Sequence, residues 1–242
     1  MNGEVLTRKW KDLTFHLPRK NDSYTFKEIL GELDQYRLEL ILPLLRPDDI
    51  VIDLGAHIGL FSLAVAKQVG QVIALEPEEE NCEIFEKNIK ENCISNVSIL
   101  QKAIAKEKGD REFYRSLLSP ARHSFFSNSF FNGFSFASEK ILIPTTTLSE
   151  IFKDFKKCKI LKADIEGAEY EVFLNSPPEL LKRIQMFFIE YHNFSDSCTG
   201  NVLSEFFRDL GFVVTEGNQT THRTRRGELT CGSLFIINPF LK

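Results

Sequence analysis

Asp164, Glu166 and Glu169 are three carboxylates within one short segment, which follows the apolar run 160–163. Neighbouring carboxylates repel one another and raise one another's pKa, which suits either a general base or a cation site. Asp164 is the strongest candidate, because it would end a buried strand. Glu166 and Glu169 either share its role or begin the next helix, where acidic side chains are favourable.

A histidine follows the apolar run 186–189 at a similar place. His192 has an ordinary pKa near neutrality, so it can take a proton from a substrate hydroxyl group. A hydrogen-bonded structural histidine is the alternative. Further along, Arg223, Arg225 and Arg226 would bind an anionic group if the strand before them ran parallel to the others, and otherwise lie at a solvated hairpin tip.

The segment 49–60 has the pattern of a buried strand, a tight glycine turn and the start of a helix. Asp53 lies near the end of the apolar run, and Gly55 and Gly59 follow it. Ligands of open parallel sheets bind at the carboxyl ends of the strands, where this loop would lie. We therefore expect the loop to form part of a nucleotide or cofactor site.

His57 stands where a dinucleotide fingerprint has its second glycine. A side chain there obstructs the approach of a pyrophosphate, which disfavours NAD and FAD. A ligand with an adenosine and no phosphate meets no such obstacle, and S-adenosylmethionine is such a ligand. Asp53 would then either fix the loop or reach the ammonium group of the methionine part.

Glu76 and Ala103 are the candidate contacts for the adenosine. Glu76 follows the apolar run 72–75, and an acid at the end of the second strand accepts hydrogen bonds from both ribose hydroxyls. Ala103 follows the run 96–100, where an adenine ring needs small or apolar walls. The glutamates 78–80 are expected to cap the following helix instead.

Short apolar runs alternate with helical patterns along the chain, which predicts an α/β fold. Residues 1–48 are expected to form a lead-in strand and helix, and residues 49–242 the main domain. Residues 109–146 form an insertion, predicted as an antiparallel hairpin at the edge of the sheet. Its Phe-rich part, 124–136, is either an apolar lid over the substrate or a loop packed on the core or on a partner subunit. The runs that predict strands are 13–17, 50–54, 72–75, 96–100, 111–115, 140–144, 160–163, 186–189, 212–215 and 233–237.

The composition limits the possible partners. The net charge of -4 argues against a general nucleic-acid binder. The five cysteines form no C-x-x-C motif, so we expect neither a disulfide framework nor a zinc site, but reduced thiols in a cytoplasmic protein. No apolar run approaches the length of a membrane span. No bound metal is predicted, although the three carboxylates leave a metal-assisted reaction open.

Four segments together resemble the FkbM family of S-adenosylmethionine-dependent methyltransferases: DIVIDLGAHIGLFSLAVA at 49–66, ALEP at 74–77, ILKADIEGAEYEVF at 160–173 and FIEYH at 188–192. The resemblance implies a Rossmann-like class I methyltransferase, with a mostly parallel seven-stranded sheet and an antiparallel last strand. It also implies methylation of a hydroxyl group, often on a sugar or a secondary metabolite.

By position, the resemblance implies that Asp53, Gly55 and Glu76 hold the cofactor. Asp164, Glu166 and His192 would lie near the transferred methyl group, and Asp164 is also expected to contact the cofactor. The family commonly has Asn where this chain has His57, and the Phe-rich insertion matches nothing in the family pattern. These departures leave the methyl acceptor open.

The sequence thus predicts an O-methyltransferase that uses S-adenosylmethionine and acts on a hydroxyl of a small molecule or glycan, with Asp164 or His192 as the base. No nucleic-acid or membrane partner is expected, and a homodimer is one option for its assembly. Two alternatives remain, a nicotinamide-dependent oxidoreductase and a non-catalytic module that binds an adenosyl ligand. His57 counts against the first, and the intact set of Asp53, Glu76 and Asp164 against the second.

Overall fold

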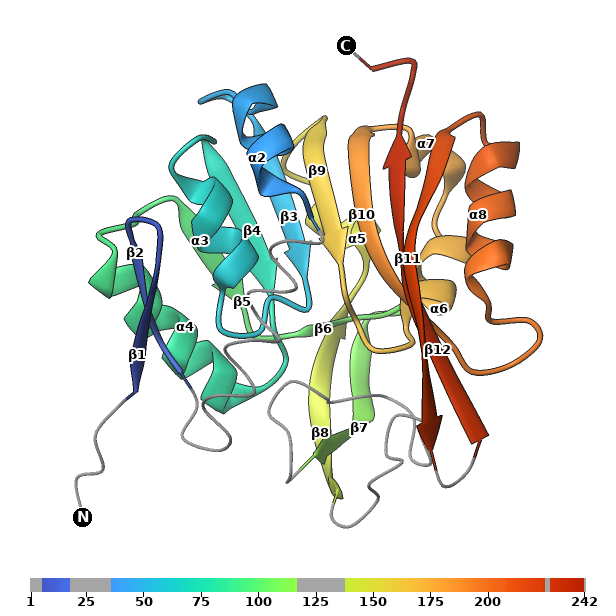
Figure 1. Cartoon of the computed structure of the whole chain (residues 1–242), viewed down its shortest axis with the longest axis horizontal. Coiled ribbons are helices and arrows are strands. Elements are labelled where there is room, and N and C mark those ends of the chain that lie inside the picture. Colours follow the sequence, from blue (N-terminus) through green and yellow to red (C-terminus); the bar gives the residue numbers. More distant parts are fainter. Residues whose placement is uncertain (1–5, 18–35, 117–137, 225–226, 242) are drawn as a thin grey trace.

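A seven-stranded sheet forms the centre of the computed structural model, which describes residues 6–17, 36–116, 138–224 and 227–241 (Figure 1). The strand order is β11-β12-β10-β9-β3-β4-β5. The strands are β3 (Ile50–Leu54), β4 (Gln71–Leu75), β5 (Val97–Leu100), β9 (Cys158–Ala163), β10 (Ile184–Asn193), β11 (Val213–Thr224) and β12 (Gly227–Ile237).

The strands of this sheet are parallel except for the last. β12 pairs antiparallel with both β10 and β11, so those two strands run in the same direction as the rest. The pairs β10–β9, β9–β3, β3–β4 and β4–β5 are all parallel. The predicted α/β fold, with its antiparallel last strand, is confirmed.

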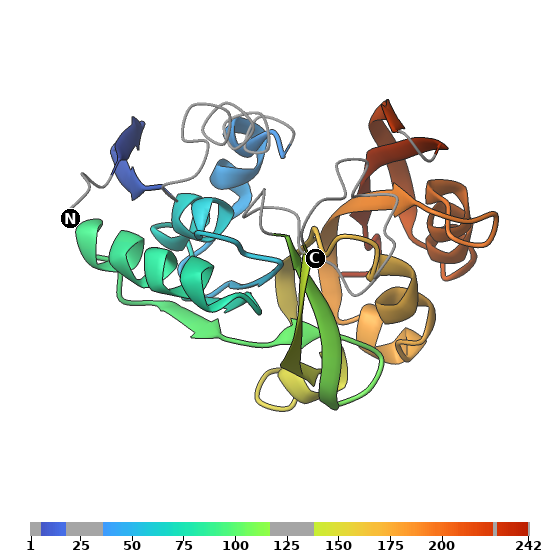
Figure 2. The same ribbon diagram turned by 90° about the horizontal axis from the view of Figure 1, so that it is seen from below.

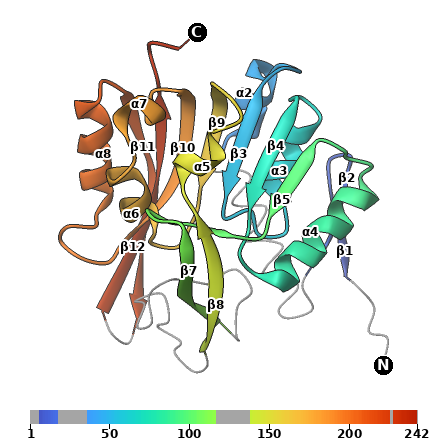
Figure 3. The ribbon, with the colours of Figure 1, turned by 180° about the vertical axis from the view of Figure 1, so that it is seen from behind.

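Alternate residues of the central strands enter two separate cores, which explains why these strands are apolar throughout. In β3, Val51 faces the core under α3 (Leu60–Ala66) and α4 (Glu79–Glu91), while Ile52 faces the opposite core. Figure 3 shows α5, α6 and α8 on that second face. Its helices are α5 (Leu148–Ile151), α6 (Glu169–Leu174), α7 (Pro178–Leu181) and α8 (Gly200–Asp209). Among the described residues, no helix has the length and apolar character needed to cross a membrane.

The inserted hairpin forms a second, smaller sheet. β7 (Gly109–Ser116) and β8 (Ser138–Thr146) pair antiparallel, and β6 (Ala103–Ile104) pairs parallel with β8. The hairpin itself is confirmed, but its expected place at the edge of the main sheet is wrong, because β8 pairs with β6. Figures 1 and 2 show this sheet extending away from the main one. The Phe-rich stretch 124–136 lies outside the described residues.

The described part of the lead-in contains one strand more than expected. β1 (Thr7–Trp10) and β2 (Leu13–His16) form a two-stranded ribbon, of which only the second strand was predicted. The predicted helix is described only from Tyr36 onward, as α2 (Leu38–Ile41) and the 3-10 turn η1 (Leu42–Leu44). Tyr36 is buried against the rings of Phe61 and Phe188.

The hairpin of β11 and β12 is longer than its apolar pattern indicated. Residues 221–224, which include Arg223 of the expected hairpin tip, belong to β11 and pair with 227–230. These polar residues lack an apolar alternation because β11 is an edge strand. β11 does run parallel to β10, which is the condition under which the arginines would face the ligand edge. Arg225 and Arg226 themselves lie outside the described residues.

Candidate active site

Close packing, against backbone at Gly55 and against an aromatic ring at Gly59, explains both glycines of the loop between β3 and α3. Gly55 has a φ of +72°, and a Cβ there would lie 1.8 Å from the carbonyl oxygen of Asp164. Gly59 has a φ of +86°, and its Cβ would lie 2.0 Å from the ring of Phe85. Only glycine fits such contacts at a positive φ. The loop therefore lies directly against the end of β9, which carries the predicted catalytic acid.

Asp53 is fully buried and holds this loop in place. It accepts a hydrogen bond of 2.7 Å from the Ser62 hydroxyl, and its other carboxylate oxygen lies 3.2 Å from Nζ of Lys162. Lys162 also donates to the carbonyl oxygen of Gly55 at 2.7 Å. Asp53 and Lys162 are paired in register on β3 and β9. This geometry fits the first of the two roles expected for Asp53, fixing the loop.

Glu76 ends β4 as a buried carboxylate within an ordered set of donors. Its Oε2 accepts from the backbone N–H of His57 at 2.8 Å, and its Oε1 accepts from Glu78 N and Asn81 Nδ2, both at 3.1 Å. Burial raises the pKa of Glu76 to about 7, although Asn81, Glu78, His57 and Lys162 oppose that shift.

The backbone of His57 explains the residue types found at this position. Its φ of 51° is in the left-handed region, where Asn and His occur more often than most other residues. His57 and the Asn that the family commonly has there thus meet the same backbone requirement. The side chain of Glu78 meanwhile caps α4 by accepting from Glu80 N, as predicted for this acidic stretch.

An adenosyl cofactor fits these residues. The buried Glu76 carboxylate can accept from hydroxyl groups, and it lies beside the loop at the carboxyl end of a parallel strand. Ala103 is buried and small, as expected for a wall near adenine, and it packs with Phe113 and Ile143 of the hairpin. The cofactor contacts of Asp53, Gly55, His57, Gly59, Glu76, Ala103 and Asp164 remain predictions.

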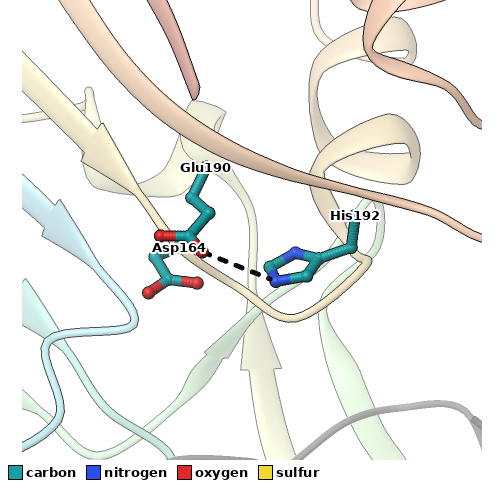
Figure 4. Close-up of side chains that lie close together, drawn as sticks. All are labelled: Asp164, Glu190 and His192. Carbon is teal, nitrogen blue, oxygen red and sulfur yellow. Dashed lines mark ion pairs between the residues drawn. The ribbon is translucent and has the colours of Figure 1, made fainter. Parts of the chain in front are cut away.

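The acidic segment and the histidine meet at the carboxyl ends of β9 and β10. Figure 4 shows Asp164, Glu190 and His192 turned toward one another, and one donor atom of each lies within 4.8 Å of the others. His192 is 5% exposed, and its Nε2 lies 3.6 Å from Glu166 Oε2 and 4.0 Å from Glu190 Oε1. The predicted Asp164, Glu166 and His192 are therefore neighbours.

Glu190 was missed as a site residue, although the sequence contains a signal for it. Residues two apart on a strand point to the same side, so the position of His192 also places Glu190 at the site. The register supports this, because Ile189 pairs with Ala163 and the next residues are Glu190 and Asp164.

Glu169 is the first residue of α6, which is one of the two roles expected for it. It also orients the side chain of His192. It is fully buried, and its Oε1 accepts from the backbone N–H groups of Ile165 and Gly167, both at 3.2 Å. The same oxygen lies 3.3 Å from Nδ1 of His192. Glu169 therefore fixes the direction of the imidazole ring.

The carboxylates change the proton affinity of the site. Burial alone would lower the pKa of His192, but Glu166, Glu169 and Glu190 outweigh it and raise that pKa well above its ordinary value. Burial raises the pKa of Glu166 to about 8, against the opposing charge of His192. The raised pKa favours the protonated form of His192, which makes it a weaker candidate for the base than Asp164.

Comparison with known proteins identifies the domain. The chain matches the Methyltransferase FkbM domain over residues 53–214. The 23S rRNA (uracil(1939)-C(5))-methyltransferase RlmD of Aliivibrio fischeri is 35% identical over 83 residues, which are 32% of this chain and 19% of that protein. The AMB antimetabolite synthetase AmbE of Pseudomonas aeruginosa is 23% identical over 232 residues, covering 79% of this chain and 11% of that protein. The chain thus spans a fifth or less of these curated relatives.

Two solved structures are similar to the chain. A methyltransferase FkbM from Methylobacillus flagellatus has a TM-score of 0.48 and 14% identity, over 79% of this chain and 44% of the other. SMU.1697c from Streptococcus mutans, a protein described as a putative methyltransferase in complex with SAH, has a TM-score of 0.47 and 9% identity, over 83% of this chain and 96% of the other.

The domain match covers more than half of the chain and includes the glycine loop, Glu76 and the cluster around His192. It favours methyl transfer over the nicotinamide-dependent alternative, in agreement with His57 in the loop. The chain therefore belongs to the FkbM family of S-adenosylmethionine-dependent methyltransferases.

Proposed function

We propose that the chain transfers the methyl group of S-adenosylmethionine to a hydroxyl of a small molecule or glycan. The observation that carries the proposal is the cluster of proton-binding side chains against the glycine loop, since Gly55 leaves no room for a Cβ beside Asp164. A hydroxyl must lose its proton as it attacks, and this cluster offers acceptors at the edge where the methyl group would lie.

Different residues of the chain would orient the cofactor and accept the proton. The bound cofactor supplies an electrophilic methyl group. Glu76 and the glycine loop orient the adenosyl part. This fixes the methyl carbon in a position where the acceptor oxygen can attack it in line. As the oxygen–carbon bond forms, the carbon–sulfur bond breaks and its electron pair stays on sulfur. Asp164 accepts the hydroxyl proton, because the surrounding carboxylates raise the pKa of His192 and favour its protonated form.

Two substitutions test this assignment with a confirmed acceptor, found by transfer of a labelled methyl group to candidate hydroxyl compounds. Removal of a general base typically lowers the rate about 10²–10⁴-fold, so Asp164→Asn should lower kcat by that order. His192→Ala should also lower kcat, through lost positioning of the cluster. If neither substitution changes turnover, the assignment of the base is wrong.

An RNA acceptor is the second candidate, and the similarity to RlmD supports it. The net charge of -4 does not favour the phosphate contacts that such binding requires. Labelled methyl transfer to ribosomal RNA, followed by mass analysis of its nucleosides, separates the candidates. We expect no incorporation into RNA; a methylated base would instead favour the second candidate.

A further inference from the structure

We propose that Asp164, Glu190 and His192 bind a divalent cation of the Mn²⁺ or Mg²⁺ type. The binding itself is independent of the methyl acceptor, while its use in catalysis rests on the proposed function. The three side chains come from the ends of two neighbouring parallel strands, β9 and β10, and combine two carboxylates with one imidazole. Such a set of oxygen and nitrogen donors without thiolates suits these cations.

The donor atoms lie close enough to share one ion once the carboxylate side chains rotate toward it. They all lie within 4.8 Å of one another, and Nε2 of His192 is 4.0 Å from Glu190 Oε1. Ligand atoms about 2.1 Å from a Mg²⁺ ion are separated by at most about 4.2 Å, when they lie on opposite sides of it. Ligand atoms on adjacent positions of the ion lie only about 3.0 Å apart, so donor atoms now up to 4.8 Å apart would have to approach by up to about 1.8 Å, through rotation of the Asp164 and Glu190 side chains.

A further carboxylate orients the histidine as metal-binding histidines are usually oriented. Glu169 Oε1 faces Nδ1 of His192 at 3.3 Å, and it is itself held by the backbone N–H groups of Ile165 and Gly167. A histidine ligand commonly donates its second N–H to such a carboxylate, which fixes the tautomer and the ring direction. Nε2 is thereby turned toward Glu190, on the side of the proposed ion.

The negative charge of the site also favours the binding of a cation. Glu166 and Glu169 add two carboxylates around His192, so four acids surround one imidazole. Glu169 is fully buried, and among the described residues its Oε2 has no hydrogen-bond partner. A buried carboxylate oxygen without a donor is costly unless positive charge lies nearby. A divalent ion would supply more of that charge than a single imidazolium.

The position of the site suggests its use. It adjoins the glycine loop at Asp164, so an acceptor hydroxyl bound to the ion would lie near the transferred methyl group. A divalent ion orients such an oxygen and lowers the pKa of its proton. In that state Asp164 serves as a ligand, and Glu166, which lies 3.6 Å from His192, can receive the proton once the nearby cation has favoured its ionised form.

Titration of the whole chain with Mn²⁺, followed by the electron paramagnetic resonance signal of the free ion, tests the proposal without cofactor or acceptor. We expect one Mn²⁺ per chain, displaced by excess Mg²⁺. Glu190→Gln and Asp164→Asn should each weaken binding more than tenfold, and Glu169→Gln about 10–100-fold. Glu86→Gln, an exposed carboxylate on α4, is the control and should bind as the native chain does.

Circular dichroism and thermal unfolding without metal establish that each variant is folded, and Mn²⁺ should raise the Tm of the native chain but not of Glu190→Gln. Absence of saturable binding by the native chain, or equal binding by folded Glu190→Gln and Asp164→Asn, would overturn the metal site. Methyl transfer that persists in EDTA, together with absent Mn²⁺ binding, would also overturn it and leave the proposed methylation standing.

Discussion

The buried charge of Lys162, on β9, connects that strand to Asp53 and to the glycine loop after β3. Its side chain is 7% exposed, and it links the Asp53 carboxylate to the carbonyl oxygen of Gly55. A buried lysine needs such partners, because an unpaired charge in the core is strongly unfavourable. The contact keeps the glycine loop of β3 against β9.

Replacing this lysine should therefore destabilise the fold. Lys162→Met leaves the fully buried Asp53 without its cation, and we expect the free energy of unfolding to fall by about 3–5 kcal/mol. Urea denaturation measures the change. Lys67→Met is the matched control, since Lys67 pairs with Asp12 at the surface and its loss should have little effect. An equally small effect at Lys162 would contradict the structural role given to it.

The raised pKa values predict how stability depends on pH. The pKa is raised to about 7 for Glu76 and to about 8 for Glu166, mainly by burial, so the folded chain holds protons that the unfolded chain has released. The raised pKa of His192 acts in the same direction. Stability should therefore fall as the pH rises from about 4.5 to about 8.

Thermal unfolding in EDTA at several pH values tests this prediction. The Tm of the native chain should decrease between about pH 5.5 and pH 8.5. Glu166→Gln resembles the protonated carboxyl and should show a shallower decrease, while the exposed Glu86→Gln should keep the native slope. A Tm of the native chain that rises over this pH range would contradict the predicted decrease of stability with pH.

Sequence reasoning found those site residues that directly follow an apolar run. Glu76 and Asp164 end recognisable strands, and His192 follows one closely. The partnership of Asp53 with Lys162 was missed, because it depends on β9 lying beside β3, which no local pattern specifies. Glu190 had a local signal, its spacing of two residues from His192 on the same strand.

At the scale of elements, the connection between β3 and α3 depends on close contact with β9. Gly55→Ala would place a methyl group 1.8 Å from the carbonyl oxygen of Asp164 at a φ of +72°. We expect a loss of stability beyond the 1–3 kcal/mol typical of backbone strain, and weaker cofactor binding. Gly109→Ala, with nothing within 4 Å of its Cβ, is the control. Urea denaturation compares the two, and equal effects would contradict the packing described for the loop.

The elements themselves were predictable to different degrees. Buried parallel strands such as β3 and β4 are continuous apolar runs, so the pattern located them within a residue or two. The partner of the inserted hairpin was not predictable, since β6 consists of two residues and its pairing with β8 is long-range. The length of β11 was underestimated because an edge strand carries polar side chains on both faces.

At the scale of the whole molecule, the fold gathers residues from distant parts of the chain at one edge of the sheet. The glycine loop after β3, Glu76 after β4, Asp164 after β9 and the end of β10 lie at the carboxyl ends of parallel strands (Figure 1). Open parallel sheets bind ligands at this edge. The order of the strands, and not any single motif, therefore brings the cofactor loop next to the acidic cluster.

Calorimetric titration with S-adenosylhomocysteine tests this account most directly, with the native chain and with Glu76→Ala side by side. The native chain should bind one equivalent. Loss of the Glu76 carboxylate removes charged hydrogen bonds worth about 1.5–3 kcal/mol each, so affinity should fall at least tenfold. Glu86→Ala, on the exposed side of α4, should bind like the native chain. Absence of binding by the native chain, or unchanged binding by folded Glu76→Ala, would contradict the assignment of this edge as the cofactor site.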